Sequence, residues 1–512
     1  MPNRIEIGPG RIAIEDVLAV AEQRSAVALS TDRAWSERIE AGARYLDRLL
    51  AENGVIYGVT TGYGESCTVA VPPELVAELP LNLIRFHGCG LGEYLSPEET
   101  LAVMVARLNS LAQGYSGVRR VLLEQLAECI NHRLLPFIPA EGSVGASGDL
   151  TPLSYVAAAL IGERDVLHAG RRRPAAEALA ELGLPRITLA PKEGLAVMNG
   201  TAVMTGLACL AWSRADYLSR LCCRLTAMAS ISLRGNRGHF DPRLFAVKPH
   251  AGQNEAAAWI YGDLAADGGE PETIRLQDRY SIRCAPHVTG VLRDALGWMR
   301  RDIENELNSA NDNPIIDGER GLVLHGGHFY GGHIAFAMDA LKTAVANQAD
   351  LMDRQMALLV DSRFSNGLPQ NLSGAEGSRA AISHGLKAVQ IGASAWAAEA
   401  LKLTMPASVF SRSTECHNQD KVSMGTIAAR DCLRVLQLTE QVAAALSLAV
   451  RQGIEFRLRQ VNGKKLQLAP AVRTFQESLA AAVPFLEQDR PLEFELRRLT
   501  EQIRGRRWHL YA

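Results

Sequence analysis

Apolar side chains recur at steps of three and four residues over long stretches of this chain, which is the spacing of one face of an α-helix. Within 333–361 the pattern includes Ile334, Met338 and Leu341. Five long alanine-rich stretches without proline predict helices, at about 202–233, 290–308, 333–361, 376–405 and 425–457. Helices of this length, separated by glycine-rich loops, are typical of a bundle whose leucine and methionine stripes form the core.

Other segments depart from the helical period. Arg4 to Ile7 alternate polar and apolar residues before a Gly-Pro-Gly sequence, which predicts a short strand and a turn. Glycines and threonines within 55–68 predict an irregular loop, and helical periodicity begins near Ser96 with an interruption at 136–151. Arginine and glutamate dominate from 453 onward, which favours a solvated helical cap. We expect an N-terminal domain, a central long-helix bundle and this C-terminal cap, at 1–201, 202–457 and 458–512.

The composition narrows the class of protein. Apolar residues make up 47% of the chain and charged residues 21%, which favours a globular protein over a disordered one. Lysine and arginine number 54 against 56 acidic residues, and no basic tract indicates nucleic-acid binding. Scattered cysteines without a Cys-x-x-Cys pair are typical of free thiols in a reducing compartment. The N-terminus shows no secretory signal, and the longest apolar run, 155–161, is too short to span a membrane. We therefore expect a cytoplasmic protein without membrane association.

The glycine-rich and histidine-rich segments do not match the common cofactor motifs. Gly88-Cys-Gly-Leu-Gly92 lacks the preceding strand and the later acidic residue of a dinucleotide-binding turn. No phosphate-binding Gly-x-x-x-x-Gly-Lys-Ser/Thr motif occurs, and no Gly-x-Ser-x-Gly motif indicates a serine hydrolase. His325, His328 and His333 lie among glycines without a nearby carboxylate, which favours hydrogen-bonding or core histidines over metal ligands. We expect neither a nucleotide nor a metal.

The segment Ala146-Ser147-Gly148 offers chemistry of a different kind. Three small residues are most often a simple turn. Glycine has no Cβ, however, so the amide nitrogen of Gly148 can approach the carbonyl carbon of Ala146 with little steric hindrance. Ring closure with loss of water, followed by loss of water from Ser147, would give a 4-methylidene-imidazol-5-one. That ring carries an electrophilic alkene, which no ordinary side chain supplies.

The three residues lie in one of seven ordered blocks in which the chain resembles the aromatic amino acid ammonia-lyase family, which includes histidine ammonia-lyases and related aminomutases. The blocks are YGVTTGYGE (57–65), GSVGASGDLTPLSY (142–155), KEGLAVMNGT (192–201), QDRYSIRC (277–284), NSANDNPIID (308–317), HGGHF (325–329) and HNQDKVSMGT (417–426). The resemblance implies an all-α, long-helix bundle of the histidine ammonia-lyase type and a homotetramer with composite active sites. It also implies non-oxidative deamination of an aromatic amino acid by a methylidene-imidazolone formed autocatalytically from Ala146, Ser147 and Gly148, with Asp149 assisting.

The resemblance assigns roles to other residues. Tyr63 matches the base that removes the β-proton of the substrate, and a phenol needs its pKa lowered by cations or dipoles to do so at neutral pH. Arg283 matches the residue that binds the substrate carboxylate. Tyr280, which assists at the amine, precedes Arg283 by three residues and should share its helical face. The remaining matches, which line the ring or bind substrate, are Asn199, Gln277, Asn313, Phe329, Glu415, Asn418 and Gln419.

Phe86-His87 occupies the position that distinguishes substrates within the family. Phenylalanine-selective members resemble Phe-Leu there, tyrosine-selective members often His-Leu, and histidine lyases Ser-His, so this pair matches none of them. Phe86 gives an aromatic wall, and His87 can hydrogen-bond to a para-hydroxyl in an apolar pocket. Gln419 stands where histidine lyases typically carry glutamate. We therefore predict a tyrosine ammonia-lyase that forms p-coumarate and accepts phenylalanine more weakly.

Three alternatives stay open at this stage. The chain could be a histidine ammonia-lyase that forms urocanate, or a 2,3-aminomutase that returns ammonia to the β-carbon. From a different class, it could be an inactive helical scaffold. The chain also departs from the family at His287 and His328, where glutamine and asparagine are usual.

Overall fold

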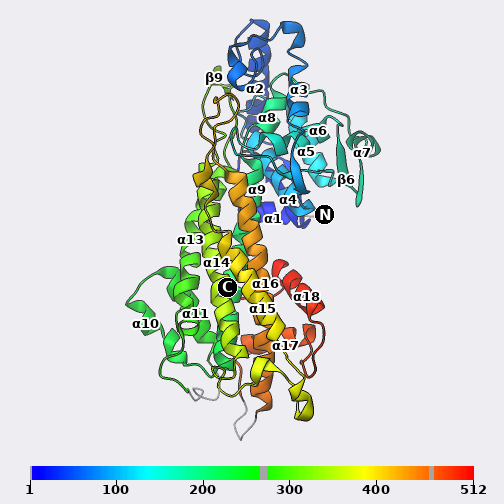
Figure 1. The fold of residues 1–512 in the computed structure, drawn as a ribbon. Coiled ribbons are helices and arrows are strands. Elements are labelled where there is room, and N and C mark those ends of the chain that lie inside the picture. The colour runs from blue at the N-terminus through cyan, green and yellow to red at the C-terminus, as the bar shows by residue number, and fades with distance from the viewer. Residues whose placement is uncertain (1–2, 266–273, 461–465, 512) are drawn as a thin grey trace. The chain divides into compact units, whose positions relative to one another are not determined.

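The computed structural model describes residues 3–265, 274–460 and 466–511, and most of them are helical (Figure 1). The chain forms two compact units, each built from segments that are not consecutive in sequence. Unit 1 comprises Met1–Ala211, Met299–Asp339 and Pro406–Arg430, and unit 2 comprises Trp212–Trp298, Ala340–Met405 and Asp431–Ala512. The sequence-based division into three consecutive domains stays a prediction.

Unit 1 is built around helix α4 (Pro97–Leu111), in which every residue from Thr100 to Leu111 is buried. A capping box starts this helix, because the Ser96 hydroxyl accepts the Glu99 N–H while the Glu99 carboxylate accepts the Ser96 N–H. The other helices that lie wholly in unit 1 are α1 (Ile14–Ala21), α2 (Arg33–Ala51), α3 (Leu79–Phe86), α5 (Arg120–Asn131), α6 (Leu150–Leu160), α7 (Ala175–Glu181) and α8 (Glu193–Met198). Short 3₁₀ turns occur at η1 (Gly64–Thr68), η2 (Pro73–Leu75) and η6 (Ala407–Phe410).

The strands among the described residues are short and all belong to unit 1. Strand β1 (Asn3–Ile7) confirms the strand expected at Arg4–Ile7 and pairs in parallel with β2 (Ser25–Leu29). The remaining pairings are antiparallel: β3 (Leu91–Tyr94) with β5 (Pro139–Glu141), β6 (Asp165–His168) with both β4 (Leu135–Pro136) and β7 (Arg171–Pro174), and β8 (Ile315–Asp317) with β9 (Leu322–Leu324). The segment 55–68 is loop and 3₁₀ turn, as expected.

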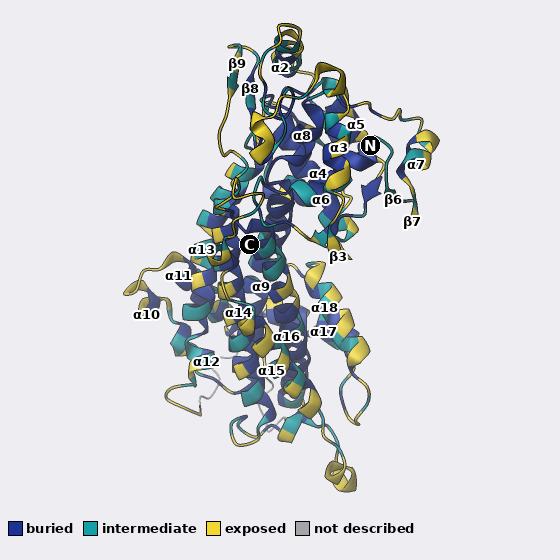
Figure 2. Cartoon of the chain, turned by 45° about the horizontal axis from the view of Figure 1, so that its top comes forward, coloured by how far each residue is buried: buried dark blue, intermediate teal, exposed yellow. Residues whose placement is uncertain are grey.

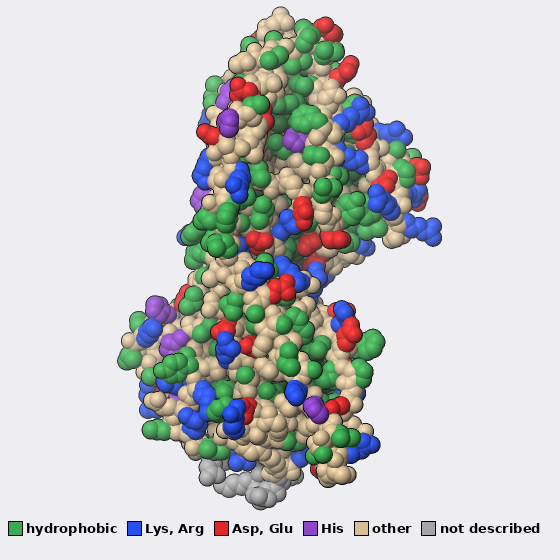
Figure 3. Space-filling model, viewed as in Figure 1, with side chains coloured by type: hydrophobic (Ala, Val, Ile, Leu, Met, Phe, Trp, Pro, Cys, Tyr) green, Lys and Arg blue, Asp and Glu red, His purple; other side chains and the backbone are tan. Residues whose placement is uncertain are grey.

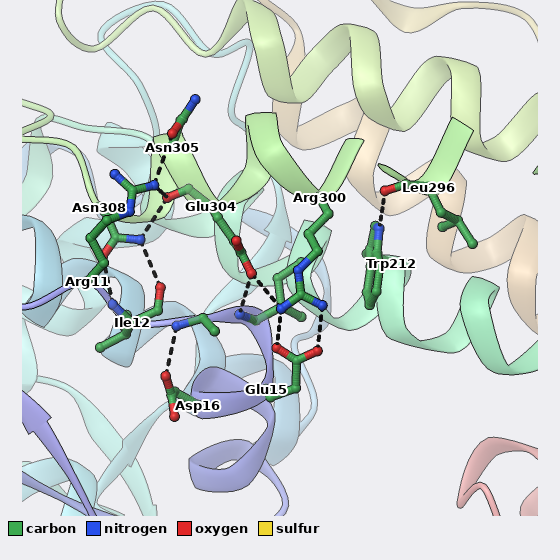
Figure 4. Close-up of polar contacts among 12 residues, drawn as sticks. Arg11, Ile12, Glu15, Asp16, Trp212, Leu296, Arg300, Glu304, Asn305 and Asn308 are labelled. Carbon is green, nitrogen blue, oxygen red and sulfur yellow. Dashed lines mark hydrogen bonds and ion pairs between the residues drawn. The ribbon is translucent and has the colours of Figure 1, made fainter. Parts of the chain in front are cut away.

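The start of α1 is tied to the last turns of α13 (Ala285–Leu307) within unit 1. The Arg300 guanidinium forms a bidentate ion pair with the Glu15 carboxylate, with N–O distances of 2.7 and 2.6 Å (Figure 4). The Ile12 N–H donates to the Asn308 side-chain oxygen, and the Asn308 amide returns a hydrogen bond to the Ile12 carbonyl. These contacts fix the end of α13 just before the 308–317 motif.

Unit 2 is a helical bundle whose long helices are buried over much of their length (Figure 2), and most of the buried side chains are apolar. Its helices include most of α9 (Ala202–Ser232), α13, α14 (Gly332–Val360) and α16 (Gly425–Arg459), together with α10 (Pro242–Ala246), α11 (Ala251–Asp263), α12 (Tyr280–Arg283), α15 (Lys387–Lys402), α17 (Pro470–Ala482) and α18 (Glu493–Arg504). Two 3₁₀ turns, η4 (Gln370–Leu372) and η5 (Gly377–Ala381), precede α15, and η3 (Arg237–Phe240) precedes α10.

Among the described residues, α16 is the one helix long and apolar enough to cross a membrane by those criteria alone. However, 78% of its most apolar window is buried inside the protein, which is typical of a core helix in a soluble protein. On the face shown in Figure 3, acidic and basic side chains are intermixed.

The five long helices confirm the periodicity argument, and two expectations need correction. The fourth helix begins at Lys387 rather than near 376, because Gly385 has a positive φ of 52° and Asp489 accepts its N–H, which ends the preceding turn. The end of the chain is not simply solvated. Helix α17 buries Val472, Phe475 and Leu479, while Arg473 and Glu477 lie on the exposed face of this amphipathic helix.

Candidate functional site

The Ala146-Ser147-Gly148 segment lies immediately before α6 in unit 1, where three helix N-termini meet. Asp149 is the N-cap residue of α6 and is fully buried. One carboxylate oxygen of Asp149 accepts the N–H groups of Val203 and Met204, both at 3.0 Å, in the first turn of α9. The other oxygen accepts the hydroxyl of Thr426, in the first turn of α16. The positive ends of three helix dipoles therefore favour negative charge beside the segment.

Two opposing effects act on the Asp149 carboxyl. Burial raises its pKa above the ordinary value, while hydrogen bonds from Thr426, Met204, Ser143 and Val203 oppose that increase. The donors tie the start of α6 to α9 and α16, so the backbone that precedes Asp149 is anchored at one end.

Position 148 requires glycine. Its φ is 71°, and a Cβ would lie 2.1 Å from the carbonyl oxygen of Gly200. Gly148 and Gly200 form a parallel bridge, and the Asp149 N–H donates to the Gly200 carbonyl at 2.7 Å. The residue type that the sequence singled out for ring closure is thus also the one that the packing requires.

Gln419 contacts the segment directly. Its side-chain nitrogen donates to the Ser147 hydroxyl oxygen at 3.2 Å, and its side-chain oxygen accepts the Thr414 hydroxyl at 2.9 Å. Thr414 and Gln419 are also joined as a backbone bridge, so the amide is held in one orientation. Asn418 lies on the exposed turn between them, and its N–H donates to the Glu415 carbonyl.

Tyr63 lies at the start of η1, with its ring against Gly58. Its hydroxyl is buried and has no hydrogen-bond partner among the described residues. Burial raises the pKa of Tyr63 above its ordinary value, and the nearby Tyr57 phenol adds to the increase. The lowering of the pKa that a base requires is therefore not found, because burial dominates the environment of this phenol.

The loop that carries Tyr63 is joined to the 414–419 turn. Both oxygens of the Glu415 carboxylate accept the Glu65 N–H, at 3.0 and 3.1 Å, and the Tyr57 hydroxyl accepts the Gly64 N–H at 2.8 Å. Gly64 has a φ of 58°, and a Cβ there would lie 2.3 Å from the Glu415 carboxylate. Glu415 is thus held beside the Tyr63 loop.

Phe86 and His87 end helix α3, with their rings 4.6 Å apart. Phe86 is 58% exposed, whereas His87 is largely buried and its Nδ1 lies 3.4 Å from the Thr151 hydroxyl. Burial lowers the pKa of His87 to about 4. The imidazole is therefore neutral at physiological pH and has one donor and one acceptor nitrogen.

The neutral state of His87 leads to a pH prediction. The folded chain binds a proton at His87 only near pH 4, whereas the unfolded chain binds it near the ordinary value of 6.5, so stability is full above that value and falls as the pH drops below it. At about pH 5 the loss reaches up to about 2 kcal/mol relative to about pH 7.5. The free energy of unfolding of His87→Gln should lack this part of the pH dependence. An unchanged dependence would contradict it, and His132→Gln, at an exposed histidine, is the control.

The other expected residues of unit 1 lie at the end of α8 and in the loops before β8 and after β9. Asn199 ends α8, and its side-chain oxygen is buried without a partner in the described part of the chain. The Asn313 side-chain oxygen accepts the Gly326 N–H at 2.9 Å. Phe329 is partly buried, next to the exposed His328. A cavity of about 550 Å³ beside this loop is lined by residues that include Glu306, His328 and Tyr330.

Three expected residues lie in unit 2 instead. The Arg283 guanidinium lies over the Tyr280 ring at 4.6 Å, which confirms that the two side chains share a face, and its Nε donates to the Asp278 carbonyl. Tyr280 is 71% exposed, and Gln277 is also exposed. The expected site residues are therefore divided between two units. His287, one of the two departures, packs its ring against Phe245 at 5.3 Å.

The sequence analysis missed several buried polar residues that support the site. Lys192 and Asp312 form an ion pair at 2.7 Å with almost no exposure, and Arg107 is fully buried. Ser143 and Thr426 complete the set around Asp149. All of these residues except Arg107 lie inside one of the recognised blocks, and that position could have indicated a role at the site. Arg107 lies outside every block.

The Lys192–Asp312 pair gives a stability prediction. Lys192→Met leaves a buried carboxylate without its cation, so we expect a loss of about 3–5 kcal/mol in the free energy of unfolding. The double variant Lys192→Met/Asp312→Asn should recover part of that loss, because the uncompensated charge is gone. Urea unfolding of both variants measures the difference. A loss below about 1 kcal/mol in the single variant would show that Asp312 does not depend on this partner.

Comparison with known proteins places the chain in one enzyme family. The profile of the aromatic amino acid lyase family matches residues 12–480. The histidine ammonia-lyase of Geobacillus sp. (strain WCH70) is 36% identical over 505 residues, 98% of this chain and 95% of that protein, and relatives named histidine ammonia-lyase from other bacteria are 36 to 38% identical.

Solved structures agree in fold. The tyrosine aminomutase of Streptomyces globisporus superimposes with a TM-score of 0.90 at 34% identity, covering 98% of this chain and 97% of that one. The histidine ammonia-lyase of Trypanosoma cruzi gives 0.88 at 30% identity, covering 98% and 93%. The expected fold is confirmed, and the chain belongs to the aromatic amino acid lyase family.

Proposed function

We propose that this protein removes ammonia from an aromatic L-amino acid by means of a 4-methylidene-imidazol-5-one formed autocatalytically from Ala146, Ser147 and Gly148. The observation that carries the proposal is the packing of Gly148 against Gly200, beside three helix N-termini. When formed, the group supplies an alkene that takes up the substrate amine and makes it a better leaving group. The residues around the segment fit such a group, because Gln419 already directs an amide at Ser147 and Asp149 anchors the following backbone.

In this proposal the side chains of the protein bind the substrate and move its proton. Tyr63 takes the β-proton, and Asn199, Asn313, Phe329, Glu415 and Gln419 line the ring or the bound amino acid. Because burial raises the pKa of Tyr63, its activity as a base depends on positive groups that join it in the assembled site. kcat/KM should then rise with pH as Tyr63 loses its proton.

We also propose that Gln277, Tyr280 and Arg283 of one copy complete the site of another copy in a cytoplasmic homotetramer. Their position in unit 2 and the exposure of Tyr280 support this arrangement. The Arg283 guanidinium would bind the substrate carboxylate through two parallel hydrogen bonds. Size-exclusion chromatography with light scattering tests it, and a monomer with full activity would contradict it.

Histidine is the substrate that the sequence relatives support. The compared curated relatives at 36 to 38% identity are named histidine ammonia-lyases, which favours the alternative over our expectation of tyrosine. Glu415, held beside the Tyr63 loop, is a carboxylate that could meet an imidazole.

Tyrosine is the second candidate, supported by two side chains of the site. Gln419 brings a neutral amide rather than a carboxylate to Ser147, and the neutral His87 has a nitrogen free to pair with a phenol. A buried polar group left unpaired costs about 1–3 kcal/mol, so His87 favours a substrate that satisfies it. Because the fold is also similar to that of a tyrosine aminomutase, the β-amino acid is measured as a possible product.

A substrate panel tests these assignments. The purified protein is incubated separately with L-histidine, L-tyrosine and L-phenylalanine, while free ammonia, the acrylate and the β-amino acid are measured. Urocanate supports the first candidate, p-coumarate the second, and a β-amino acid the mutase. In Gln419→Glu, the ratio of kcat/KM for histidine over tyrosine should rise by at least about tenfold. If none of the three amino acids gave a product, the proposed reaction would be overturned.

A further inference from the structure

Arg107 is a fully buried cation on α4 whose hydrogen bonds go to backbone carbonyls. Its two terminal nitrogens donate to the Asn311 carbonyl at 3.2 and 3.1 Å, and one of them also donates to the Asn199 carbonyl at 3.1 Å. Its Nε has no partner among the described residues. A single guanidinium therefore joins two of the recognised blocks, 192–201 and 308–317, which lie far apart in the sequence.

The same guanidinium packs behind the glycine that supports the Ala-Ser-Gly segment. A Cβ at Gly200 would lie 2.0 Å from the Arg107 Nη1 and 2.6 Å from the Asn311 carbonyl oxygen, so Gly200 is enclosed between them. On its other side Gly200 pairs with Gly148 and accepts the Asp149 N–H. Arg107, Gly200 and Gly148 are thus stacked in direct contact, and a shift of the guanidinium would release the backbone on which Gly148 rests.

We propose that Arg107 is a positioning residue for ring formation, one that holds Asn199–Gly200 so that the Gly148 nitrogen lies near the Ala146 carbonyl carbon. The inference rests on the proposed function, since it concerns how the ring forms. In that reaction the Gly148 N–H adds to the Ala146 carbonyl, and the resulting hydroxyl leaves as water with the Ser147 amide proton. The Ser147 Cα proton and hydroxyl leave as the second water, so no oxidant is needed.

Ring closure depends strongly on this kind of restraint. Bringing two groups of one chain into reacting geometry can replace about 7–11 kcal/mol of a barrier, and a small displacement forfeits much of that gain. Asp149 already fixes the backbone on the C-terminal side of Gly148. Arg107 adds a restraint on Gly148 itself, through Gly200. A lysine at 107 would keep the charge but not the planar, forked donor geometry that reaches both carbonyls.

A cation in this place also suits its surroundings. Asp149 and Asp312 both lie near enough to favour the charged form, while burial lowers the pKa of Arg107 to about 10. The guanidinium therefore remains protonated at neutral pH. Its charge balances those of two buried carboxylates, Asp149 and Asp312. Removing it would also break the hydrogen bonds to the Asn199 and Asn311 carbonyls.

The test compares Arg107→Lys with a matched control, Arg457→Lys. Arg457 is also a nearly fully buried arginine. Its guanidinium donates to the backbone carbonyls of Ser232, Ser365 and Asn366 and to the Gln460 side-chain oxygen, and all four acceptors lie in unit 2. Ring content is read from the mass of the tryptic peptide 134–164, which contains the segment, and folding is read from circular dichroism and thermal midpoints.

We expect wild type and Arg457→Lys to lack two water molecules in this peptide, and most Arg107→Lys chains to keep them while folded. An Arg107→Lys protein with the wild-type deficit would overturn the inference. If Arg107→Lys does not fold, Ser110→Ala decides, because the Ser110 hydroxyl accepts the Asn311 N–H at 3.0 Å and steadies its carbonyl. Slower ring formation in Ser110→Ala, by about fivefold, supports the inference, and an unchanged rate overturns it.

These outcomes separate the inference from the proposed function. A wild-type peptide of unmodified mass would remove the ring and with it both proposals. A modified wild type with an equally modified, folded Arg107→Lys would remove only the role of Arg107.

Discussion

Ser147→Ala is expected to lower kcat by on the order of 10⁶-fold, the scale of loss seen when a covalent catalytic group is removed from other enzymes. The Ser147 hydroxyl is the leaving group in the second loss of water, so an alanine there cannot give the alkene. The change should leave the fold intact, because among the described residues the hydroxyl has one hydrogen-bond partner, the Gln419 amide at 3.2 Å. Ammonia release from histidine and from tyrosine measures the loss.

The control for this substitution is a buried serine outside the site. Ser447→Ala removes a hydroxyl that donates to the Ala443 carbonyl within α16, in unit 2, and should leave kcat unchanged. Thermal midpoints of the two variants should both lie close to wild type. A Ser147→Ala protein with activity within about tenfold of wild type would mean that the reaction does not use the ring.

Tyr63→Phe is expected to lower kcat by about 10²–10⁴-fold, the usual contribution of a positioned acid or base. The phenol hydroxyl has no hydrogen-bond partner among the described residues, so its removal should not disturb folding or ring formation. The tryptic peptide 134–164 of this variant should therefore still lack two water molecules. Together, lost turnover and a retained mass deficit separate proton abstraction from formation of the ring.

Tyr57→Phe is the matched control in the same loop. The Tyr57 hydroxyl accepts the Gly64 N–H at 2.8 Å, so its loss loosens the loop without removing the proposed base. We expect a smaller loss of kcat than in Tyr63→Phe. Near-normal activity in Tyr63→Phe would assign proton abstraction to another residue.

The sequence was sufficient to predict the long helices and the chemistry-bearing segment. Periodicity located α9, α14 and α16 because each buries a continuous apolar stripe that repeats along the chain. The glycine requirement at Gly148 was argued from backbone access, and the packing against Gly200 supports it for a second, independent reason. The shared face of Tyr280 and Arg283 also follows from spacing alone.

Features that depend on contacts between distant segments could not be predicted. The start of α15 is set by Asp489, more than a hundred residues later. The four donors to Asp149 come from the first turns of α9 and α16 and from Ser143 in the loop before α6. Burial raises the pKa of Tyr63, and Tyr57 adds to the increase, so the lowering that a base needs is not found. Burial of this side chain could not be judged from the sequence. Arg107 carried no signal, because a buried arginine and a surface arginine look the same in a sequence.

The substrate is the point on which sequence and comparison differ. Phe86-His87 and Gln419 led to tyrosine, and the structure adds that His87 is neutral, whereas the names of the relatives lead to histidine. Pocket preference depends on a few polar groups at the end of the side chain, and changing one of them can change specificity without altering the fold.

Mass spectrometry of the tryptic peptide 134–164 from freshly purified, active wild-type protein tests the central claim most directly. The account predicts a peptide lighter by two water molecules, with fragment ions that place the whole deficit between Ala146 and Gly148. An unmodified peptide from protein that releases ammonia at full rate would contradict it.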